Sequence, residues 1–227
     1  MRRRVFTCRW RLIRSAKLSQ TALDEKLLLL INREWTSPVL DKIMAAASSF
    51  DAWLPLFVVL ILVVFWRGGF RARAFLVTMG LIVGINDGIV AHILKHEVDR
   101  PRPHQSHNDV RIVELAKARP RCVALFKPVE VRMSRAELSD VQGRSFPSGH
   151  TINTMSVALV AVAFYGARGA WAFVIAGCVA YSRIYTGSHW PSDVLTTIPL
   201  AFGATLLWLA LGNWLWQRYG ARFLPRV

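Results

Sequence analysis

Three short polar clusters in this sequence carry residue types that could bind a phosphate group and cleave its ester bond. Their sequences are KHEVDRPRP (Lys95 to Pro103), GRSFPSGH (Gly143 to His150) and SRIYTGSHWPSD (Ser182 to Asp193). Arginine donates forked hydrogen bonds to phosphoryl oxygens, lysine adds a point charge, and backbone N–H groups at a helix start bind anions. The candidate residues are Lys95, Arg100, Arg102, Ser148, His150, Arg183, His189 and Asp193.

The two histidines of these clusters suit an acid role and a nucleophilic role near neutral pH. Asp193 follows His189 by four residues, which is one helical turn if the stretch is helical. There it could fix the tautomer of the imidazole, as the third member of a catalytic triad does.

Each candidate also has a simpler structural explanation. Lys95 and Arg102 could be snorkelling or positive-inside residues at a membrane surface. Residues 147–149 could be an ordinary turn and helix cap, and His189 could be an interfacial residue beside Trp190. The chemical interpretation depends on whether the three clusters meet.

The rest of the chain has the composition of an integral membrane protein. Of its 227 residues 53% are apolar, and long uncharged runs alternate with basic segments. We expect an all-α bundle of five to six transmembrane helices, the sixth arising if an N-terminal pair of helices inserts as a hairpin with the first span. The five spans are Ala52 to Trp66, Ala74 to Leu94, Thr151 to Ala167, Gly169 to about Tyr185, and Val194 to Gln217.

The topology of these spans brings the clusters together. Adjacent spans alternate in direction, so the end of span two, the start of span three, the end of span four and the start of span five all lie on one membrane face. The clusters occupy those four ends. Because neighbouring helices in a bundle lie about 8–10 Å apart, the clusters can form one pocket.

Two regions flank this arrangement. Residues 1–50 are expected to form a basic tail (Met1 to Lys17) and two amphipathic helices at the membrane interface, the second beginning at Ser37-Pro38. Residues 51–227 would form the transmembrane domain, with the polar segment 95–147 capping one membrane face.

The net charge of +15 raises the question of nucleic-acid binding. The basic residues lie in loops and tails around apolar runs, which favours anionic lipid or a phosphorylated substrate instead. Cys8, Cys122 and Cys178 are scattered and lack metal-type spacing, so they predict neither a disulfide framework nor a zinc site.

Two further signals leave alternatives open. His92 and His96 have i, i+4 spacing and His104 and His107 follow, so a zinc site is conceivable, although no cysteine or HExxH pattern supports it. Asp87 is an acid within the second span. It is either a functional residue or a hydrogen-bonded partner of a neighbouring helix, and we do not assign it to the site.

At these clusters the sequence resembles the type 2 phosphatidic acid phosphatase (PAP2) family, in the superfamily that includes vanadium haloperoxidases. The tripartite signature of that family is K-x6-RP, PSGH and SR-x5-H-x3-D. Here it reads Lys95 with Arg102-Pro103, then residues 147–150, then Ser182-Arg183 with His189 and Asp193. The matches cover Lys95 to Asp193, under half of the chain.

The resemblance implies a role for each matching residue. His189 would be the nucleophile that forms a phosphohistidine, Asp193 would orient it, and His150 would protonate the leaving group. The phosphoryl oxygens would be held by Lys95, Arg102, Ser148, Gly149 and Arg183. It implies no metal and no cofactor, because cationic side chains would offset the charge of the transition state.

The implied activity is removal of a terminal phosphate from a membrane lipid. The family's substrates include undecaprenyl diphosphate, phosphatidate, phosphatidylglycerophosphate and lipid A phosphates, of which we rank the polyprenyl diphosphate first. The alternatives are a soluble phosphate ester, as in the glucose-6-phosphatase branch, and a lipid-binding or transport protein without catalysis. We expect no nucleic acid and no obligate protein partner.

The orientation follows from charge. The face opposite the clusters carries no acid but seven arginines, which the positive-inside rule places in the cytoplasm: Arg67, Arg71, Arg73, Arg168, Arg218, Arg222 and Arg226. The site would then lie on the extracytoplasmic face of a bacterial inner membrane, as the resemblance also favours. Five spans would place the basic N-terminus outside too, a conflict that a sixth span or a cytoplasmic site would remove.

Overall fold

The computed structural model of the chain describes residues 22–135 and 144–220. The predicted basic tail, Met1 to Lys17, lies outside the described residues, as do positions 136–143 of the polar segment and Arg222 and Arg226. Residues 22–29 are helical and run into a π-helical turn, η1 (Leu30–Glu34). The helices that follow are α2 (Pro38–Ser48), α3 (Phe50–Arg67), α4 (Phe70–Ile85), η2 (Asn86–Ala91), α5 (His92–Val98), α6 (Pro103–Ser106), η3 (Arg121–Phe126), α7 (Gly149–Tyr165), η5 (Gly166–Ala170), α8 (Trp171–Tyr185) and α9 (Pro191–Tyr219).

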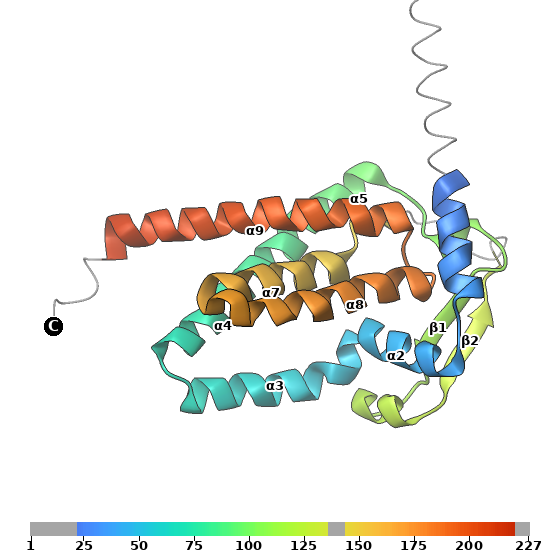
Figure 1. Ribbon diagram of the computed structural model, residues 1–227, viewed down its shortest axis with the longest axis horizontal. Coiled ribbons are helices and arrows are strands. Elements are labelled where there is room, and N and C mark those ends of the chain that lie inside the picture. The colour runs from blue at the N-terminus through green and yellow to red at the C-terminus, as the bar shows by residue number, and fades with distance from the viewer. Residues whose placement is uncertain (1–21, 136–143, 221–227) are drawn as a thin grey trace, which may run out of the picture.

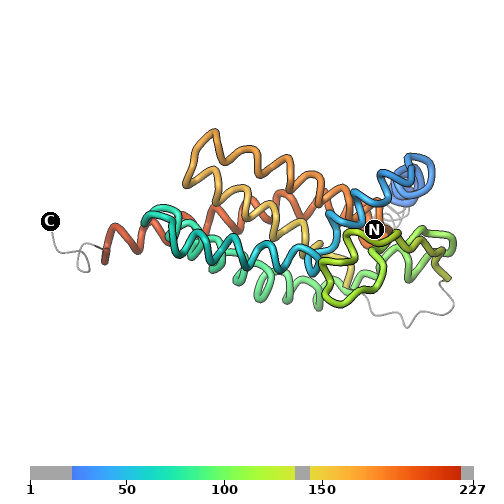
Figure 2. The backbone as a smooth tube through the Cα atoms, turned by 90° about the horizontal axis from the view of Figure 1, so that it is seen from below, coloured from blue at the N-terminus to red at the C-terminus, as the bar shows by residue number. Residues whose placement is uncertain are grey.

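The long helices form a bundle with a small polar assembly at one end. Figure 1 shows α3, α4, α7, α8 and α9 running along the longest axis of the molecule, while α2 and the two strands gather at one end. Figure 2 shows the same elongated bundle after a turn of 90°. Helix α7 is central, since it contacts α4, α8 and α9.

Within residues 22–135 and 144–220, four segments are long and apolar enough to cross a membrane: Phe50–Arg67, Phe70–Ser106, Gly149–Tyr185 and Pro191–Tyr219. The third contains two helices, α7 and α8, which turn back on each other through η5 (Figure 1). These two helices match the predicted spans Thr151 to Ala167 and Gly169 to Tyr185. The number of segments that cross the membrane, five or six, stays a prediction.

The outer surface of the bundle is apolar. Only 6% of the α3 segment is buried inside the molecule, and its exposed residues from Leu54 to Trp66 are leucine, proline, valine, isoleucine, phenylalanine and tryptophan. An apolar surface of this extent is stable in lipid and not in water, while the helices satisfy their own backbone hydrogen bonds. The chain is therefore an integral membrane protein.

Local sequence explains where these helices begin and end. The hydroxyl of Ser37 accepts a hydrogen bond from the Leu40 N–H (3.1 Å) with proline at the next position, so α2 begins where the sequence predicted. Helix α3 ends before Gly68, where a Cβ atom would lie 2.3 Å from the Val64 carbonyl oxygen. A side chain would not fit in this tight turn between α3 and α4.

The polar assembly contains an antiparallel pair of strands, β1 (Arg111–Leu115) and β2 (Val129–Met133). The prediction of an all-α fold was wrong in this respect. Strand β2 has alternating valines, Val129 and Val131, and β1 has the adjacent Ile112 and Val113, but both strands are short and lie within a segment rich in proline and charge. The fold is thus mostly helical with one two-stranded sheet in the part of the chain that the structure describes.

Buried polar contacts fix the sheet to the bundle. The Asn32 side chain donates to the backbone carbonyls of Arg111 (2.8 Å) and Tyr185 (2.7 Å), and accepts from the Arg111 N–H (2.8 Å). The Arg111 guanidinium engages both oxygens of Asp41, at 3.0 and 2.8 Å, and the Tyr185 hydroxyl donates to Asp41 at 2.6 Å. Strand β1 is therefore tied to η1, α2 and the end of α8.

A second polar network lies inside the bundle, away from the clusters. The fully buried Asn86 donates to the hydroxyls of Ser156 (2.9 Å) and Thr205 (3.2 Å), and its side-chain oxygen accepts from the Trp208 indole (3.0 Å). Thr205 also donates to Ser156 at 2.9 Å. Interhelical hydrogen bonds of this kind each contribute roughly 0.6–1.7 kcal/mol in membrane proteins. The network joins η2, α7 and α9.

We predict that Asn86→Ala lowers the free energy of unfolding in detergent by about 1–3 kcal/mol, because it leaves buried polar groups unpaired. The measurement is chemical unfolding followed by tryptophan fluorescence. Asn213→Ala is the matched control, since Asn213 is exposed on α9. Equal stability of the two variants would contradict the role given to the network.

Candidate active site

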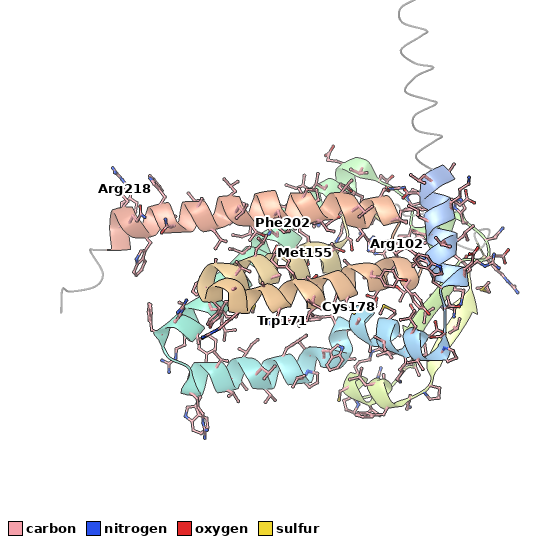
Figure 3. The ribbon with its side chains drawn as sticks, in the orientation of Figure 1. Arg102, Met155, Trp171, Cys178, Phe202 and Arg218 are labelled. Carbon is pink, nitrogen blue, oxygen red and sulfur yellow. The ribbon has the colours of Figure 1, made fainter. Side chains whose placement is uncertain are left out.

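The three polar clusters meet at one end of the bundle. The first follows α5, the second leads into α7, and the third joins the end of α8 to the start of α9. Figure 3 shows Arg102 beside the neighbouring ends of α8 and α9, with Arg218 at the far end of α9. The convergence predicted from topology is therefore present in the structure.

The turn between α8 and α9 positions His189. Gly187 has a positive φ of 70°, and a Cβ atom there would lie 2.6 Å from the carbonyl oxygen of Arg111. Only glycine combines this conformation with so close an approach. The N–H groups of Ser188 and His189 both donate to the Arg183 carbonyl at 3.1 Å, which closes the turn and directs His189 inward.

The His189 ring is buried, with 3% of the residue exposed, and one ring nitrogen is fixed. Nδ1 lies 2.6 Å from the backbone carbonyl oxygen of Ser145. A carbonyl can only accept, so we assign the proton of the neutral ring to Nδ1. Nε2 then carries an unshared electron pair, which is the state that a nucleophile requires.

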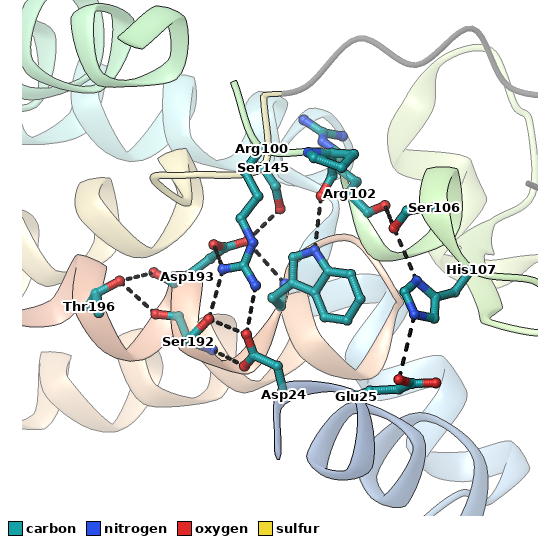
Figure 4. A network of polar contacts seen from close by, with 12 residues as sticks. Asp24, Glu25, Arg100, Arg102, Ser106, His107, Ser145, Ser192, Asp193 and Thr196 are labelled. Carbon is teal, nitrogen blue, oxygen red and sulfur yellow. Dashed lines mark hydrogen bonds and ion pairs between the residues drawn. The ribbon is translucent and has the colours of Figure 1, made fainter. Parts of the chain in front are cut away.

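Ser145 also connects this contact to Asp193. Its hydroxyl donates to Asp193 Oδ2 at 2.5 Å, and its N–H donates to the Arg100 carbonyl at 2.8 Å (Figure 4). Asp193 is fully buried, and it accepts further hydrogen bonds from the Arg100 guanidinium (2.6 Å) and the Trp190 N–H (3.2 Å). The carboxylate thus sits at the centre of a network that links all three clusters.

The route from Asp193 to His189 differs from the expected one. Helical spacing and the resemblance both suggested that Asp193 orients the imidazole directly. Within the described residues, Asp193 makes hydrogen bonds to Ser145, Arg100 and Trp190 but none to His189. The reason is local: His189 lies in the turn, and α9 begins only at Pro191. Asp193 at its third position then caps the Trp190 N–H.

Burial lowers the pKa of His189 well below its usual value of 6.5, and the nearby charges of Arg183 and Arg102 lower it further. The hydrogen bond to Ser145 acts in the opposite direction and is the weaker effect. The imidazole is consequently neutral at neutral pH in the empty site.

Gly149, the first residue of α7, lies against two charged side chains. A Cβ atom at this position would be 3.1 Å from Asp87 Oδ1 and 3.4 Å from Lys95 Nζ. The preceding Ser148 is fully buried: its N–H donates to Thr197 (3.1 Å) and its hydroxyl accepts from Thr151 (3.0 Å). The start of α7 is therefore fixed beside the Lys95 ammonium, and a Cβ atom at Gly149 would require the Asp87 carboxylate to shift by a few tenths of an ångström.

Arg183 projects from the last turn of α8 and is 9% exposed. Its Nη1 donates to the backbone and the hydroxyl of Ser48, at the end of α2. Its Nε is buried and has no hydrogen-bond partner in the described part of the chain. A buried guanidinium N–H without a partner is unfavourable unless a ligand accepts a hydrogen bond from it, and an anion would do so.

The His150 ring interacts electrostatically with the positive charges of Arg183, Arg102 and Lys95, and it hydrogen-bonds to the Ser48 backbone. The His150 ring also interacts electrostatically with the His189 ring. None of the three cations forms an ion pair with a carboxylate among residues 22–135 and 144–220. The structure thus brings together all eight residues predicted for the site, and it leaves Lys95, Arg102 and Arg183 available to an anion.

The other signals have separate positions. The rings of His92 and His96 pack edge to face at 4.7 Å, whereas His104 bonds to the Gly187 carbonyl and His107 lies 3.7 Å from Glu25. No three histidine, cysteine, aspartate or glutamate side chains group as metal ligands within the described segments. The zinc arrangement that the spacing left open does not form there.

A sequence profile of the PAP2 superfamily matches residues 71–217, which is more than half of the chain. The chain belongs to the PAP2 superfamily. Among curated PAP2-type relatives, it is 24% identical to the lipid A 4'-phosphatase of Bacteroides thetaiotaomicron over 76% of this chain and 69% of that protein. It is also 24% identical to the undecaprenyl-diphosphatase BcrC of Bacillus subtilis, over 72% of this chain and 70% of that protein.

A further match, to YbjG of Escherichia coli strain K12, is 34% identical but spans only 33% of this chain and 40% of that protein. Two solved structures share the PAP2 fold. Aquifex aeolicus LpxE has a TM-score of 0.57 and 23% identity, covering 83% of this chain and 95% of that chain. A transmembrane PAP2-type phosphatidylglycerolphosphate phosphatase from Bacillus subtilis has a TM-score of 0.53 and 23% identity, covering 94% of this chain and 97% of that chain.

Sequence reasoning missed three contributors to this PAP2 site. Ser145 lies inside the second cluster but received no role, because a backbone carbonyl leaves no signal in residue type. Ser48, which binds Arg183, and Asp24, which binds Arg100 at 2.7 Å, come from segments far from the clusters. No spacing rule connects them to the site.

We predict that Gly149→Ala lowers kcat/KM roughly tenfold, because the added methyl group displaces Asp87 or Lys95 by a few tenths of an ångström where a phosphate must bind. Gly177→Ala is the control, since a Cβ atom at that helical glycine meets nothing within 4 Å. Phosphate release by the two variants is compared in the same detergent. Equal loss in both would show that the effect is general.

We also predict that the acid limb of the kcat/KM profile lies below pH 6.5. The lowered pKa of His189 keeps its imidazole neutral, and so nucleophilic, until the pH falls below the ordinary histidine value. The profile is measured from pH 4 to 9 and corrected for the second ionisation of a phosphate monoester near pH 6. A corrected limb above 6.5 would exclude the neutral form as the controlling state.

Proposed function

We propose that this protein is a membrane lipid phosphatase, which removes the terminal phosphate from a lipid phosphate or diphosphate through a phosphohistidine at His189. The observation that carries the proposal is a buried histidine, with its Nδ1 fixed by Ser145, beside three cations that lack carboxylate partners. Membership of the PAP2 superfamily supports it.

In the first step, the Nε2 electron pair of His189 attacks phosphorus and the bond from phosphorus to the leaving oxygen breaks. His150, in the imidazolium form that the bound phosphate dianion favours, donates a proton to that oxygen, and the lipid leaves as an alcohol or a monophosphate. Lys95, Arg102 and Arg183 hold the equatorial oxygens, together with Ser148 and the Gly149 N–H. These groups stabilise the charge that spreads over the phosphoryl group in the transition state.

In the second step, water attacks the phosphorus of the phosphohistidine and the P–N bond breaks. His150, now neutral, accepts a proton from the water, and His189 regains its electron pair. Inorganic phosphate leaves, and both histidines return to their starting states. The cations supply the electrostatic stabilisation that Mg²⁺ gives in many other phosphoryl-transfer enzymes, so the proposed reaction needs no metal.

The substrate class follows from the setting and the relatives. The site lies where helices with a lipid-facing surface end, so a lipid can remain in the bilayer while its head group reaches the cations. Relatives are named for undecaprenyl diphosphate and for the lipid A 4'-phosphate. We rank a polyprenyl diphosphate first, ahead of lipid A phosphates, phosphatidylglycerophosphate and phosphatidate.

We further propose that five or six helices span the membrane and that the site faces the extracytoplasmic side of a bacterial inner membrane. The turn between α3 and α4 and the end of α9 carry Arg67, Arg71, Arg73 and Arg218, which supports a cytoplasmic location for that end. Residues 22–48 would lie at the outer interface next to the site.

Two other functions share this geometry. A soluble phosphate ester could bind to the same cations, and a binding protein could use these cations for recognition alone. Recognition would not need a neutral buried histidine with a fixed tautomer, a second histidine and a buried carboxylate. This observation favours catalysis over binding.

The test is phosphate release by the purified protein with chelator present. We expect release from undecaprenyl diphosphate, and a loss of at least about 1,000-fold in His189→Ala because the nucleophile is absent. His92→Ala is the control, since His92 is exposed on α5. Rapid quench of the reaction with labelled substrate into alkaline detergent should trap a phosphoenzyme in the wild type only, because phosphohistidine is stable in base and labile in acid.

Phosphatidate, lipid A and a soluble ester such as glucose 6-phosphate are measured in parallel. Faster release from the soluble ester would move the assignment to that class. Activity that needs Mg²⁺ and disappears with chelator would contradict the cation-based mechanism. Folded protein that binds lipid phosphate without release from any substrate would support the binding function.

A further inference from the structure

A continuous set of polar contacts connects the N-terminal helix to the proposed nucleophile, and Figure 4 shows its part from Asp24 to Ser145. It runs from Asp24, in the helical residues 22–29, through Arg100 and Asp193 to Ser145, whose carbonyl binds His189. Every junction is a hydrogen bond of 2.5–2.7 Å. Asp24 lies outside residues 71–217, the part that matches the PAP2 profile.

Arg100 is the central junction of this chain of contacts. Its Nη2 donates to Asp24 (2.7 Å) and its Nη1 donates to Asp193 (2.6 Å), so its forked donors bridge two carboxylates. The guanidinium also lies 5.3 Å from the centre of the Trp190 ring, in cation–π contact. Unlike Lys95, Arg102 and Arg183, this cation is already neutralised, and it is not free to hold a phosphate.

Asp24 holds a second point of the site, the start of α9. Its Oδ1 accepts from the Ser192 N–H (2.8 Å), its Oδ2 accepts from the Ser192 hydroxyl, and that hydroxyl accepts from Arg100 Nη1 (2.8 Å). Ser192 precedes Asp193. A single carboxylate therefore fixes both the cation that binds Asp193 and the backbone that carries it.

The burial of these groups gives the contacts their weight. Asp24 is 4% exposed and Asp193 is fully buried. A buried carboxylate needs a charged partner and complete hydrogen bonding to remain ionised, and removal of one partner of such a pair is strongly destabilising locally. If Asp24 were neutral, Arg100 would keep only one carboxylate partner, Asp193. Its guanidinium would then be held less firmly, and the negative charge of Asp193 would be less completely balanced.

We propose that Asp24 and Arg100 are positioning residues, which form a clamp that holds Asp193 and Ser145 and thereby fixes the His189 ring for attack on phosphorus. The N-terminal helix is then part of the catalytic unit and not merely a membrane anchor. The expected effect of the clamp on kcat rests on the proposed phosphatase function. Its expected effect on the positions of Asp193 and Ser145 does not.

The kinetic test compares Asp24→Asn with Glu25→Gln. Both remove one negative charge from the same helix, but the Glu25 side chain is 46% exposed and lies only near His107. Since the phosphate-binding cations are untouched, we expect Asp24→Asn to lower kcat per active enzyme roughly 10-fold to 100-fold with KM within about twofold, and Glu25→Gln to match the wild type. Active enzyme is counted as the protein that elutes in the folded, monodisperse peak of size-exclusion chromatography, so partial misfolding does not lower the value.

The structural test is hydrogen–deuterium exchange of the same purified proteins. The Ser145 N–H donates to the Arg100 carbonyl, so a loosened clamp exposes it. We expect faster uptake at residues 144–150 in Asp24→Asn and none of this change in Glu25→Gln. If Asp24→Asn does not fold, Arg100→Lys takes its place, because lysine keeps the charge but cannot bridge two carboxylates with a fork.

The outcomes separate the two proposals. Wild-type kcat together with unchanged uptake in Asp24→Asn would overturn the clamp. Faster deuterium uptake with wild-type kcat would show that the clamp stabilises the structure only, and it would overturn the positioning role. If the wild type releases no phosphate from any substrate, the proposed function fails while the exchange result still decides whether the clamp exists.

Discussion

The hydrogen bond from His189 Nδ1 to the Ser145 carbonyl is the interaction on which the site depends. It assigns the proton to one ring nitrogen and leaves the other bare. It also joins the third polar cluster to the second, which are separated by a complete helical hairpin. A backbone carbonyl is a fixed acceptor whose position follows from the fold, so the ring orientation is set by how α7 and α9 begin rather than by a flexible side chain. The contacts of Asp193 and Arg100 serve to keep that carbonyl in place.

Around this bond, the site holds three cations in fixed positions without carboxylates to balance their charge. Arg183 has a buried N–H without a partner, and Lys95 and Arg102 lack carboxylate partners in the described part of the chain. Burying cations in this way is unfavourable in the empty protein. The stabilisation returns when an anion binds, and it is greatest for the spread charge of a phosphoryl group in transfer. Arg100 shows the contrast, because its two carboxylates make it a structural cation.

The sequence predicted the bundle and the convergence of the eight candidate residues at one end of it because both depend on strong local signals. Apolar runs give the spans, and alternation of direction places Lys95, Ser148, His189 and Asp193 at one end. The antiparallel sheet was missed because β1 and β2 are short and lie in a proline-rich segment, where periodicity is weak. The route from Asp193 through Ser145 could not be predicted, since spacing along a helix says nothing about a residue in the preceding turn. Asp24 and Ser48 reach the site only through tertiary packing.

The network around Asn86 has a consequence for how the protein is made. Asn86 binds Ser156 and Thr205, which follow it by 70 and 119 residues. When α4 first enters the bilayer during synthesis, neither partner has left the ribosome. The amide must then remain with water, lipid head groups or the insertion machinery until α7 and α9 arrive, because hydrocarbon offers it no hydrogen bonds. The second span thus gains its full set of buried interhelical hydrogen bonds only after the last helix has been inserted.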